Sequence, residues 1–145
     1  MFGVLAAFAL IIAACGGASE NAVDETPVPS PSIEAEETPT ISDSYITLEQ
    51  YEANKAAYTD EKVVLFFNAQ WCSTCKSARA NFEANLADFP ADLTIVLVDY
   101  DTALDLRKTY GVTLQHTFVQ VDVNGKELAK WSGSKTIEEV VGNID

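Results

Sequence analysis

Cys72 and Cys75, two cysteines separated by two residues, are the side chains of this sequence best suited to chemistry. They follow an apolar run at 63–67 and precede a segment, 77–82, whose composition suits a helix. A helix N-terminus carries partial positive charge and free N–H groups, which favour a thiolate over a thiol. The i, i+3 spacing brings the second sulfur one turn behind the first, within reach of a disulfide. The pattern therefore predicts a dithiol that exchanges disulfides, in a strand–turn–helix setting that makes this C-x-x-C motif specific.

The third cysteine, Cys15, lies far from this pair in the sequence. A disulfide scaffold would need more pairs, distributed so that they join distant loops. A bond between Cys72 and Cys75 closes only a very short loop, which restrains the unfolded chain little. Reactivity is therefore a better explanation of the pair than stability.

The overall charge excludes some classes of partner. The 145 residues include 22 acidic and 9 basic side chains, for a net charge of −13. Such a surface argues against nucleic acid and against electrostatic attraction to anionic lipid. The length suits one domain with appendages.

The N-terminus has the pattern of a targeting segment. Residues 4–14 are uncharged and almost wholly apolar. At ~1.5 Å per residue this run is shorter than the ~30 Å hydrocarbon core, but it has the length of a signal-peptide core. It ends in Ile12-Ala13-Ala14-Cys15, which resembles the lipobox of bacterial lipoproteins. That resemblance implies that residues 1–14 are removed and that Cys15 carries a lipid, so that the protein is anchored to a membrane in the extracytoplasmic cell envelope.

The segment departs from the lipoprotein pattern at its start, since residues 1–3 supply no Lys or Arg. The true start could lie upstream. The alternatives are an ordinary secretory signal with a coincidental cysteine, or a hydrophobic N-terminal anchor.

Residues 16–44 have the composition of a disordered tether. They contain four prolines, many Ser and Thr, and seven acidic but no basic side chains. So few apolar residues cannot offset the entropy lost on ordering, and charge repulsion with proline keeps such a chain extended. We expect a spacer that holds a domain at 45–145 away from the membrane; a tail with no specific role is the alternative.

Periodicity divides 45–145 into alternating strands and helices. Thr47 with Gln50 forms a capping-box pattern, and Asn124-Gly125 is a strong hairpin signal. The continuously apolar strands at 63–68 and 93–98 suit parallel neighbours in a buried sheet. The fold class is α/β, with a mixed central sheet flanked by helices. The remaining expected elements are helices at 47–58, 73–87, 101–110 and 136–144, and strands at 117–123 and 127–132.

This pattern resembles the thioredoxin superfamily over residues 45–145. The matching residues are Trp71-Cys72, Cys75-Lys76, Asp101, Tyr110-Gly111-Val112, Thr117, Asn124-Gly125 and Gly133. The resemblance implies a thioredoxin-like fold and a thiol–disulfide oxidoreductase with no cofactor beyond the Cys72–Cys75 disulfide. Cys72 would attack a partner's disulfide and Cys75 would resolve the mixed disulfide. Its partners would be protein thiols and disulfides of the cell envelope, and we expect a monomer.

Four neighbours flank the predicted thiols. Trp71 would cover the site as an apolar flank, or simply pack beside the loop. Lys76 would favour the thiolate slightly, or remain solvated. Ser73 and Thr74 carry hydroxyls that could donate hydrogen bonds to the thiolate, which would favour the oxidising direction. Whether the protein reduces or oxidises its partners stays open.

Two positions depart from the family's pattern. His116 precedes Thr117 where the family has a cis-proline beside the thiols. A cis peptide bond without proline costs ~2.5–4 kcal/mol, so we predict a trans or locally rearranged bond. Phe66 occupies the position, six residues before Cys72, of the family's buried carboxylate. The usual proton acceptor for the resolving cysteine is therefore missing.

His116, the only histidine, has three interpretations. Its imidazolium could stabilise the Cys72 thiolate, or its neutral ring could accept the proton of Cys75. Cys72, Cys75 and His116 could instead bind zinc or copper, which would make the protein a metal carrier rather than an enzyme. The third interpretation is a half-exposed histidine that merely fills proline's place. A thioredoxin-like binding module with a vestigial disulfide is a further alternative for the whole domain.

Overall fold

The structure, a computed structural model, describes residues 42–145. The predicted signal segment, Cys15 and the tether up to residue 41 lie outside the described residues. Between residues 42 and 145, no helix is long and apolar enough to cross a membrane.

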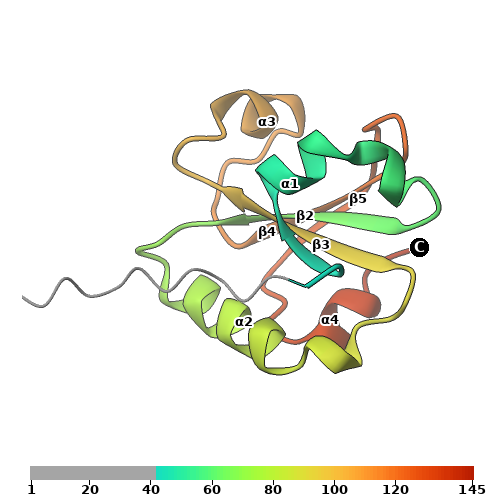
Figure 1. Cartoon of the computed structure of the whole chain (residues 1–145). Coiled ribbons are helices and arrows are strands. Elements are labelled where there is room, and N and C mark those ends of the chain that lie inside the picture. The colour runs from blue at the N-terminus through green and yellow to red at the C-terminus, as the bar shows by residue number, and fades with distance from the viewer. Residues whose placement is uncertain (1–41) are drawn as a thin grey trace, which may run out of the picture. The chain divides into compact units, whose positions relative to one another are not determined.

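A mixed sheet of five strands forms the centre of these residues (Figure 1), in the order β1-β3-β2-β4-β5. β2 pairs in parallel with β3, and β3 with β1, while β4 is antiparallel to both β2 and β5. β2 and β3 are buried along nearly their full length, as their continuous apolar runs predict. The strands are β1 (Tyr45–Thr47), β2 (Lys62–Asn68), β3 (Leu93–Asp99), β4 (Thr117–Val121) and β5 (Glu127–Ser132).

Helices cover both faces of the sheet. Figure 1 shows α2 and α4 on one face and α1 and α3 on the other. The predicted α/β architecture, a mixed sheet flanked by helices, is therefore confirmed. The helices are α1 (Leu48–Ala53), α2 (Ser73–Ala84), α3 (Leu104–Thr109) and α4 (Ile137–Val141).

Every helix is shorter than predicted. Thr47 caps α1 through the predicted capping box with Gln50, but α1 ends at Ala53 and a separate 3₁₀ turn, Lys55–Tyr58, follows. A 3₁₀ turn likewise replaces the predicted last turn of α2. α3 starts later than predicted because the Asp99 carboxylate accepts the N–H groups of residues 101 and 102 and holds a turn there.

The ends of the hairpin and the start of the sheet also differ from the prediction. β4 ends at Val121, beside a register irregularity, because the Asp122 carboxylate accepts the N–H groups of Asn124 and Lys126 and begins the turn. β1 was not predicted. It has only three residues and pairs with the edge of β3, a pattern too short to stand out from the helix that follows.

Three aromatic side chains, Phe66, Phe118 and Trp131, form a row across the sheet, which we call the aromatic row. They are direct cross-strand partners on β2, β4 and β5. The rings of Phe66 and Phe118 stack with centroids 4.4 Å apart, and those of Phe118 and Trp131 stack at 5.6 Å. Phe82 of α2 meets Phe66 edge-on at 6.0 Å. These contacts fix α2, and so its N-terminal cysteines, against the sheet.

Candidate active site

Cys72 and Cys75 form a disulfide at the N-terminus of α2, with Cα atoms 5.2 Å apart. β2 ends at Asn68, a short loop follows, and Cys72 is the N-cap residue of α2. The Cys72 sulfur accepts the backbone N–H of Cys75 at 3.1 Å. This contact lies where the helix N–H groups are unpaired and the helix dipole is positive, so it favours negative charge on the Cys72 sulfur.

The two cysteines differ in access. Cys72 is 5% exposed and Cys75 is fully buried. A partner protein can therefore reach the disulfide only from the Cys72 side. Cys72 is therefore the cysteine of this pair that a partner can contact first.

Trp71 stands beside the disulfide and is 62% exposed. Its indole N–H donates to the Asp101 carboxylate at 2.9 Å, which fixes the ring across the turn after β3. The Asn68 amide donates to the Val98 carbonyl at 3.1 Å and joins the ends of β2 and β3 beneath this loop. Trp71 thus presents an exposed apolar surface that is held in place next to Cys72.

The hydroxyl of Ser73 and the ammonium of Lys76 have no bond to either sulfur within the region that the structure describes. Both residues are exposed. Thr74 is different, since its hydroxyl lies 3.3 Å from the Cys72 sulfur. Of the Ser73 and Thr74 hydroxyls, which the sequence offered as donors to the thiolate, only that of Thr74 lies within hydrogen-bond distance of a cysteine sulfur.

His116 adopts a left-handed backbone conformation, with φ of 59°. None of the peptide bonds in residues 42–145 is cis, so the predicted trans bond before His116 is confirmed. The backbone N–H of His116 donates to the Phe67 carbonyl at 2.8 Å, and its carbonyl accepts from Gly133 at 3.2 Å. These two bonds, to β2 and to the end of β5, hold a conformation that costs a non-glycine residue roughly 1–2 kcal/mol.

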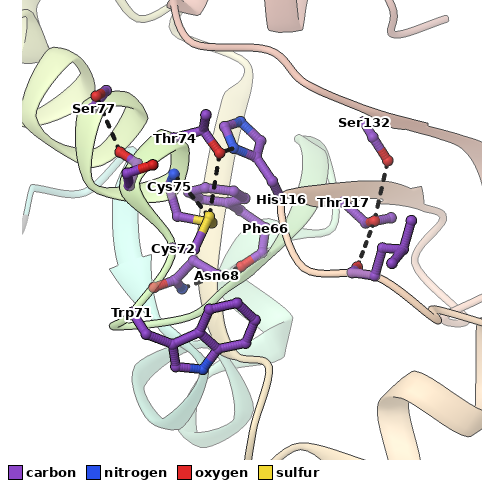
Figure 2. The surroundings of a disulfide bond; sticks show 12 residues. Phe66, Asn68, Trp71, Cys72, Thr74, Cys75, Ser77, His116, Thr117 and Ser132 are labelled. Atoms are coloured by element: carbon purple, nitrogen blue, oxygen red, sulfur yellow. Dashed lines mark hydrogen bonds between the residues drawn. A yellow bond between two sulfur atoms is a disulfide. The ribbon is translucent and has the colours of Figure 1, made fainter.

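The His116 ring is buried, with 6% of the residue exposed, so the third interpretation is wrong in describing this histidine as half-exposed. The ring meets those of Phe66 and Phe118 edge-on at 5.5 and 5.7 Å. Figure 2 shows it beside Thr74, above Phe66 and near the disulfide. Substitution of proline by histidine therefore places an imidazole inside the site.

Both ring nitrogens of His116 have a hydrogen-bond partner. Nε2 lies 2.8 Å from the backbone carbonyl oxygen of Ser134, and Nδ1 lies 2.8 Å from the Thr74 hydroxyl. A chain of contacts thus runs from the Cys72 sulfur through the Thr74 hydroxyl to the His116 ring (Figure 2), and on from His116 to the Ser134 carbonyl. Nothing in the sequence pointed to Ser134, and Thr74 was considered only as a donor to the thiolate.

Thr117 lies near the site but does not touch the disulfide. Its hydroxyl donates to the Leu114 carbonyl at 2.7 Å and lies 3.1 Å from the Ser132 hydroxyl. Figure 2 shows this pair on the far side of His116 from the cysteines. Thr117 shapes the loop that carries His116.

No carboxylate approaches the disulfide through a hydrogen bond in residues 42–145. Phe66, at the position of the family's buried acid, is fully buried and belongs to the aromatic row. Among the residues that the structure describes, the side chains hydrogen-bonded to the Cys72 sulfur or the Thr74 hydroxyl include one general acid–base group, the imidazole of His116.

The sulfurs of Cys72 and Cys75 and one ring nitrogen of His116 lie within 4.8 Å of one another. With the disulfide reduced, these soft and borderline donors suit zinc or copper. Against this use, each His116 nitrogen already has a partner, and a metal at Nδ1 would displace the Thr74 hydroxyl. The hydrogen bonds therefore favour thiol chemistry over metal binding, and we do not assign these residues as ligands.

Known proteins are similar to this chain in sequence and in architecture. The thioredoxin family model matches residues 44–145. Thioredoxin from Gallus gallus is 31% identical over 99 residues, which cover 67% of this chain and 92% of that protein. The crystal structure of Fasciola hepatica thioredoxin is 26% identical, with a TM-score of 0.54 over 68% of this chain and 93% of that one. A thioredoxin from Nicotiana alata, 22% identical, has the same fold, with a TM-score of 0.56 over 74% and 99%. With the Cys72–Cys75 pair at disulfide distance, the chain belongs to the thioredoxin family and is a redox protein of that family.

Proposed function

We propose that this protein is a membrane-tethered, extracytoplasmic thiol–disulfide oxidoreductase in which Cys72 attacks and Cys75 resolves. The observation that carries the proposal is the disulfide at the N-terminus of α2, whose Cys72 sulfur accepts the Cys75 N–H. In the reduced protein the Cys72 thiolate forms a mixed disulfide with a partner protein. Cys75 then attacks the Cys72 sulfur, which releases the reduced partner and restores the internal disulfide.

Trapping of the mixed disulfide tests the assignment of the two cysteines. With Cys75→Ser the second step cannot occur, so partners should stay bound to Cys72 through a bond that dithiothreitol breaks. The matched control, Cys72→Ser, keeps only the fully buried Cys75 of the pair, and the peptide that contains Cys75 should be found joined to no partner. Equal trapping by both variants would contradict the assignment of Cys72 as the nucleophile.

The direction of electron flow follows from the midpoint potential of the Cys72–Cys75 couple. Equilibration against glutathione buffers, read by thiol alkylation and mass, measures it directly. A potential near about −270 mV would make the protein a reductant, and one near about −120 mV an oxidant. A pair of cysteines that is not reversibly oxidised and reduced in these glutathione buffers would contradict the oxidoreductase proposal.

The tether and the location rest on the sequence of residues 1–44. The apolar run 4–14 and the lipobox ending at Cys15 support export and lipid attachment, and the acidic, proline-rich residues 16–44 support a spacer. A labelled fatty acid fed to cells should be incorporated into the wild-type protein but not into Cys15→Ala. A Cys15→Ala variant that keeps the label would contradict lipidation at this residue.

Metal carriage is the second candidate, favoured by the 4.8 Å cluster of Cys72, Cys75 and His116. It predicts that the reduced protein binds one zinc or copper(I) ion and that Cys75→Ser loses affinity without trapping any partner. The oxidoreductase proposal predicts trapping whether or not a chelator is present. The same variant therefore separates the two functions.

A further inference from the structure

We propose that Thr74 and His116 form a proton relay that takes the proton of the Cys72 thiol and so supplies the attacking thiolate. The relay rests on the proposed function, because it acts on the reduced form of the pair. Thr74 touches the reacting sulfur and passes the proton, and His116 holds it. Unlike the family's buried carboxylate, which serves the resolving cysteine and whose position Phe66 occupies, this relay serves the attacking Cys72.

The partner of Nε2 fixes how the His116 ring carries its protons. The Ser134 carbonyl, 2.8 Å from Nε2, can only accept a hydrogen bond. Nε2 therefore carries a hydrogen in both charge states of the ring. In the neutral ring Nδ1 has a free lone pair, and this nitrogen faces the Thr74 hydroxyl at 2.8 Å. The contact with Ser134 thus makes Nδ1 the only ring position that can gain or lose a proton.

The Thr74 hydroxyl is oriented by the same argument. It has one hydrogen to donate and two possible acceptors, Nδ1 at 2.8 Å and the Cys72 sulfur at 3.3 Å. The nitrogen is the closer and stronger acceptor, so the hydroxyl hydrogen points to His116. The lone pairs of Thr74 are then left facing Cys72. When the disulfide is reduced, they can accept the thiol hydrogen, so every donor in the chain points toward His116.

The transfer along this chain conserves protons and electrons. The Cys72 S–H bond breaks as its proton passes to the Thr74 oxygen, and the original hydroxyl proton passes to Nδ1 of His116. Thr74 ends with one hydroxyl hydrogen, now donated to the Cys72 thiolate, while the imidazolium donates from Nδ1 to Thr74. No electrons move in this step.

The thiolate then attacks one sulfur of the partner disulfide. A Cys72–partner S–S bond forms, the partner's own S–S bond breaks, and the leaving sulfur takes up the proton that His116 releases. Attack by Cys75, which loses its own proton to the second leaving sulfur, completes the exchange. The dithiol has then lost two protons and two electrons, and the partner disulfide has gained them.

The surroundings of the relay contain few other groups that titrate. Cys75 is the one beside Cys72 on α2. The aromatic rings of Phe66 and Phe118 face His116 from β2 and β4. The charged side chains nearest in sequence, Lys76 and Lys135, are exposed. In residues 42–145, no charged side chain bonds to His116, so the pH dependence of Cys72 should report on the relay.

The rate at which iodoacetamide alkylates Cys72 tests the relay without any partner protein. The reduced full chain is alkylated in EDTA between about pH 5 and 9, where Cys and His titrate, and the Cys72 peptide is quantified by mass. Thr74→Val keeps the shape of the side chain but removes the hydroxyl. It should raise the midpoint pH by about one unit and lower the rate at pH 7 about tenfold. Thr74→Ser should restore most of the wild-type rate.

Two more variants complete the comparison. His116→Asn keeps an amide oxygen that can accept from Thr74 and suits a positive φ, but it cannot take a proton. It should shift the midpoint as Thr74→Val does. Ser77→Ala is the matched control, because it removes a hydroxyl of α2 that donates to the Ser73 carbonyl and, within residues 42–145, has no bond to Cys72, Thr74 or His116. It should leave the midpoint unchanged.

The double variant, Thr74→Val with His116→Asn, should shift the midpoint no further than either single change, because each already breaks the same chain. Shifts that add, or a Thr74→Val protein with the wild-type midpoint, would overturn the relay, even with partner trapping intact. A protein whose midpoints shift as expected but whose Cys75→Ser form traps no partner would instead contradict the proposed function.

Discussion

Proline at position 116, which would restore the family's residue, should destabilise this protein. Proline holds φ near −65° and has no N–H, whereas His116 has φ of 59° and donates its N–H to Phe67 at 2.8 Å. Loss of that bond leaves a buried carbonyl unpaired, at roughly 1–3 kcal/mol, and the backbone must also leave its left-handed conformation. We expect His116→Pro to lower the free energy of unfolding by about 3 kcal/mol or more.

His116→Asn is the matched control for this change. It also loses the imidazole, but it keeps the backbone N–H and tolerates a positive φ. The difference between the two variants therefore isolates the backbone. Urea unfolding of the oxidised protein at pH 7 measures both. With a slope of about 1–3 kcal/mol per M, proline should lower the midpoint by at least about 1 M more than asparagine does. Equal midpoints would refute the backbone conformation and hydrogen bond described for His116.

Three further changes probe the fold. Burial raises the pKa of Tyr45, so the folded state keeps this phenol protonated. The neutral Tyr45 phenol therefore contributes to the free energy of unfolding below about pH 10. This contribution is lost as the pH rises further, by up to about 1.4 kcal/mol per pH unit. The urea midpoint of the wild-type protein should fall between pH 9 and 11, and Tyr45→Phe should make this fall smaller. If the fall is unchanged in Tyr45→Phe, the loss of stability comes from other groups, such as Tyr51 and Tyr110, whose pKa values burial also raises. Phe82→Ala, which empties the fully buried contact between α2 and the aromatic row, should cost about 3–5 kcal/mol in the same assay, and a cost below about 1 kcal/mol would contradict that packing. In Gly125→Ala, the added Cβ would contact only the Tyr110 hydroxyl, at 3.6 Å, so the loss of stability should come from the φ of 77° alone. We expect a cost of about 1 kcal/mol, which corresponds to a calorimetric unfolding midpoint lower by about 4–8 °C. An unchanged unfolding midpoint would contradict this conformation.

The elements that could be predicted from the sequence are those specified by a local pattern. The apolar runs of β2 and β3, the Asn124-Gly125 turn and the Thr47 capping box each depend on neighbouring residues, and the structure has all of them. The helices were predicted to be longer than they are, because side chains such as Asp99 accept backbone N–H groups at the helix ends and hold turns there. The three-residue β1 exists only because β3 offers it an edge.

The candidate site also has features that could be predicted from the sequence and features that only the folded structure shows. The disulfide between Cys72 and Cys75 follows from spacing within one turn of helix. The position of His116 as a departure from the family's pattern was also visible in the sequence. Its bonds were not, because they join His116 to Thr74 across 42 residues and to Ser134 across 18. Only the closed fold brings these three residues together.

The strand order has a consequence for how the protein is made. β2, at the centre of the sheet, needs β3 on one side and β4 on the other, and β4 arrives late in the chain. A ribosome therefore delivers both thiols, at positions 72 and 75, well before the histidine and the hairpin that enclose them. Such long-range pairing also folds slowly, because distant segments must meet first. A newly made chain thus has its cysteines before it has their surroundings, and the tuning of their reactivity must wait for the last strands to be added.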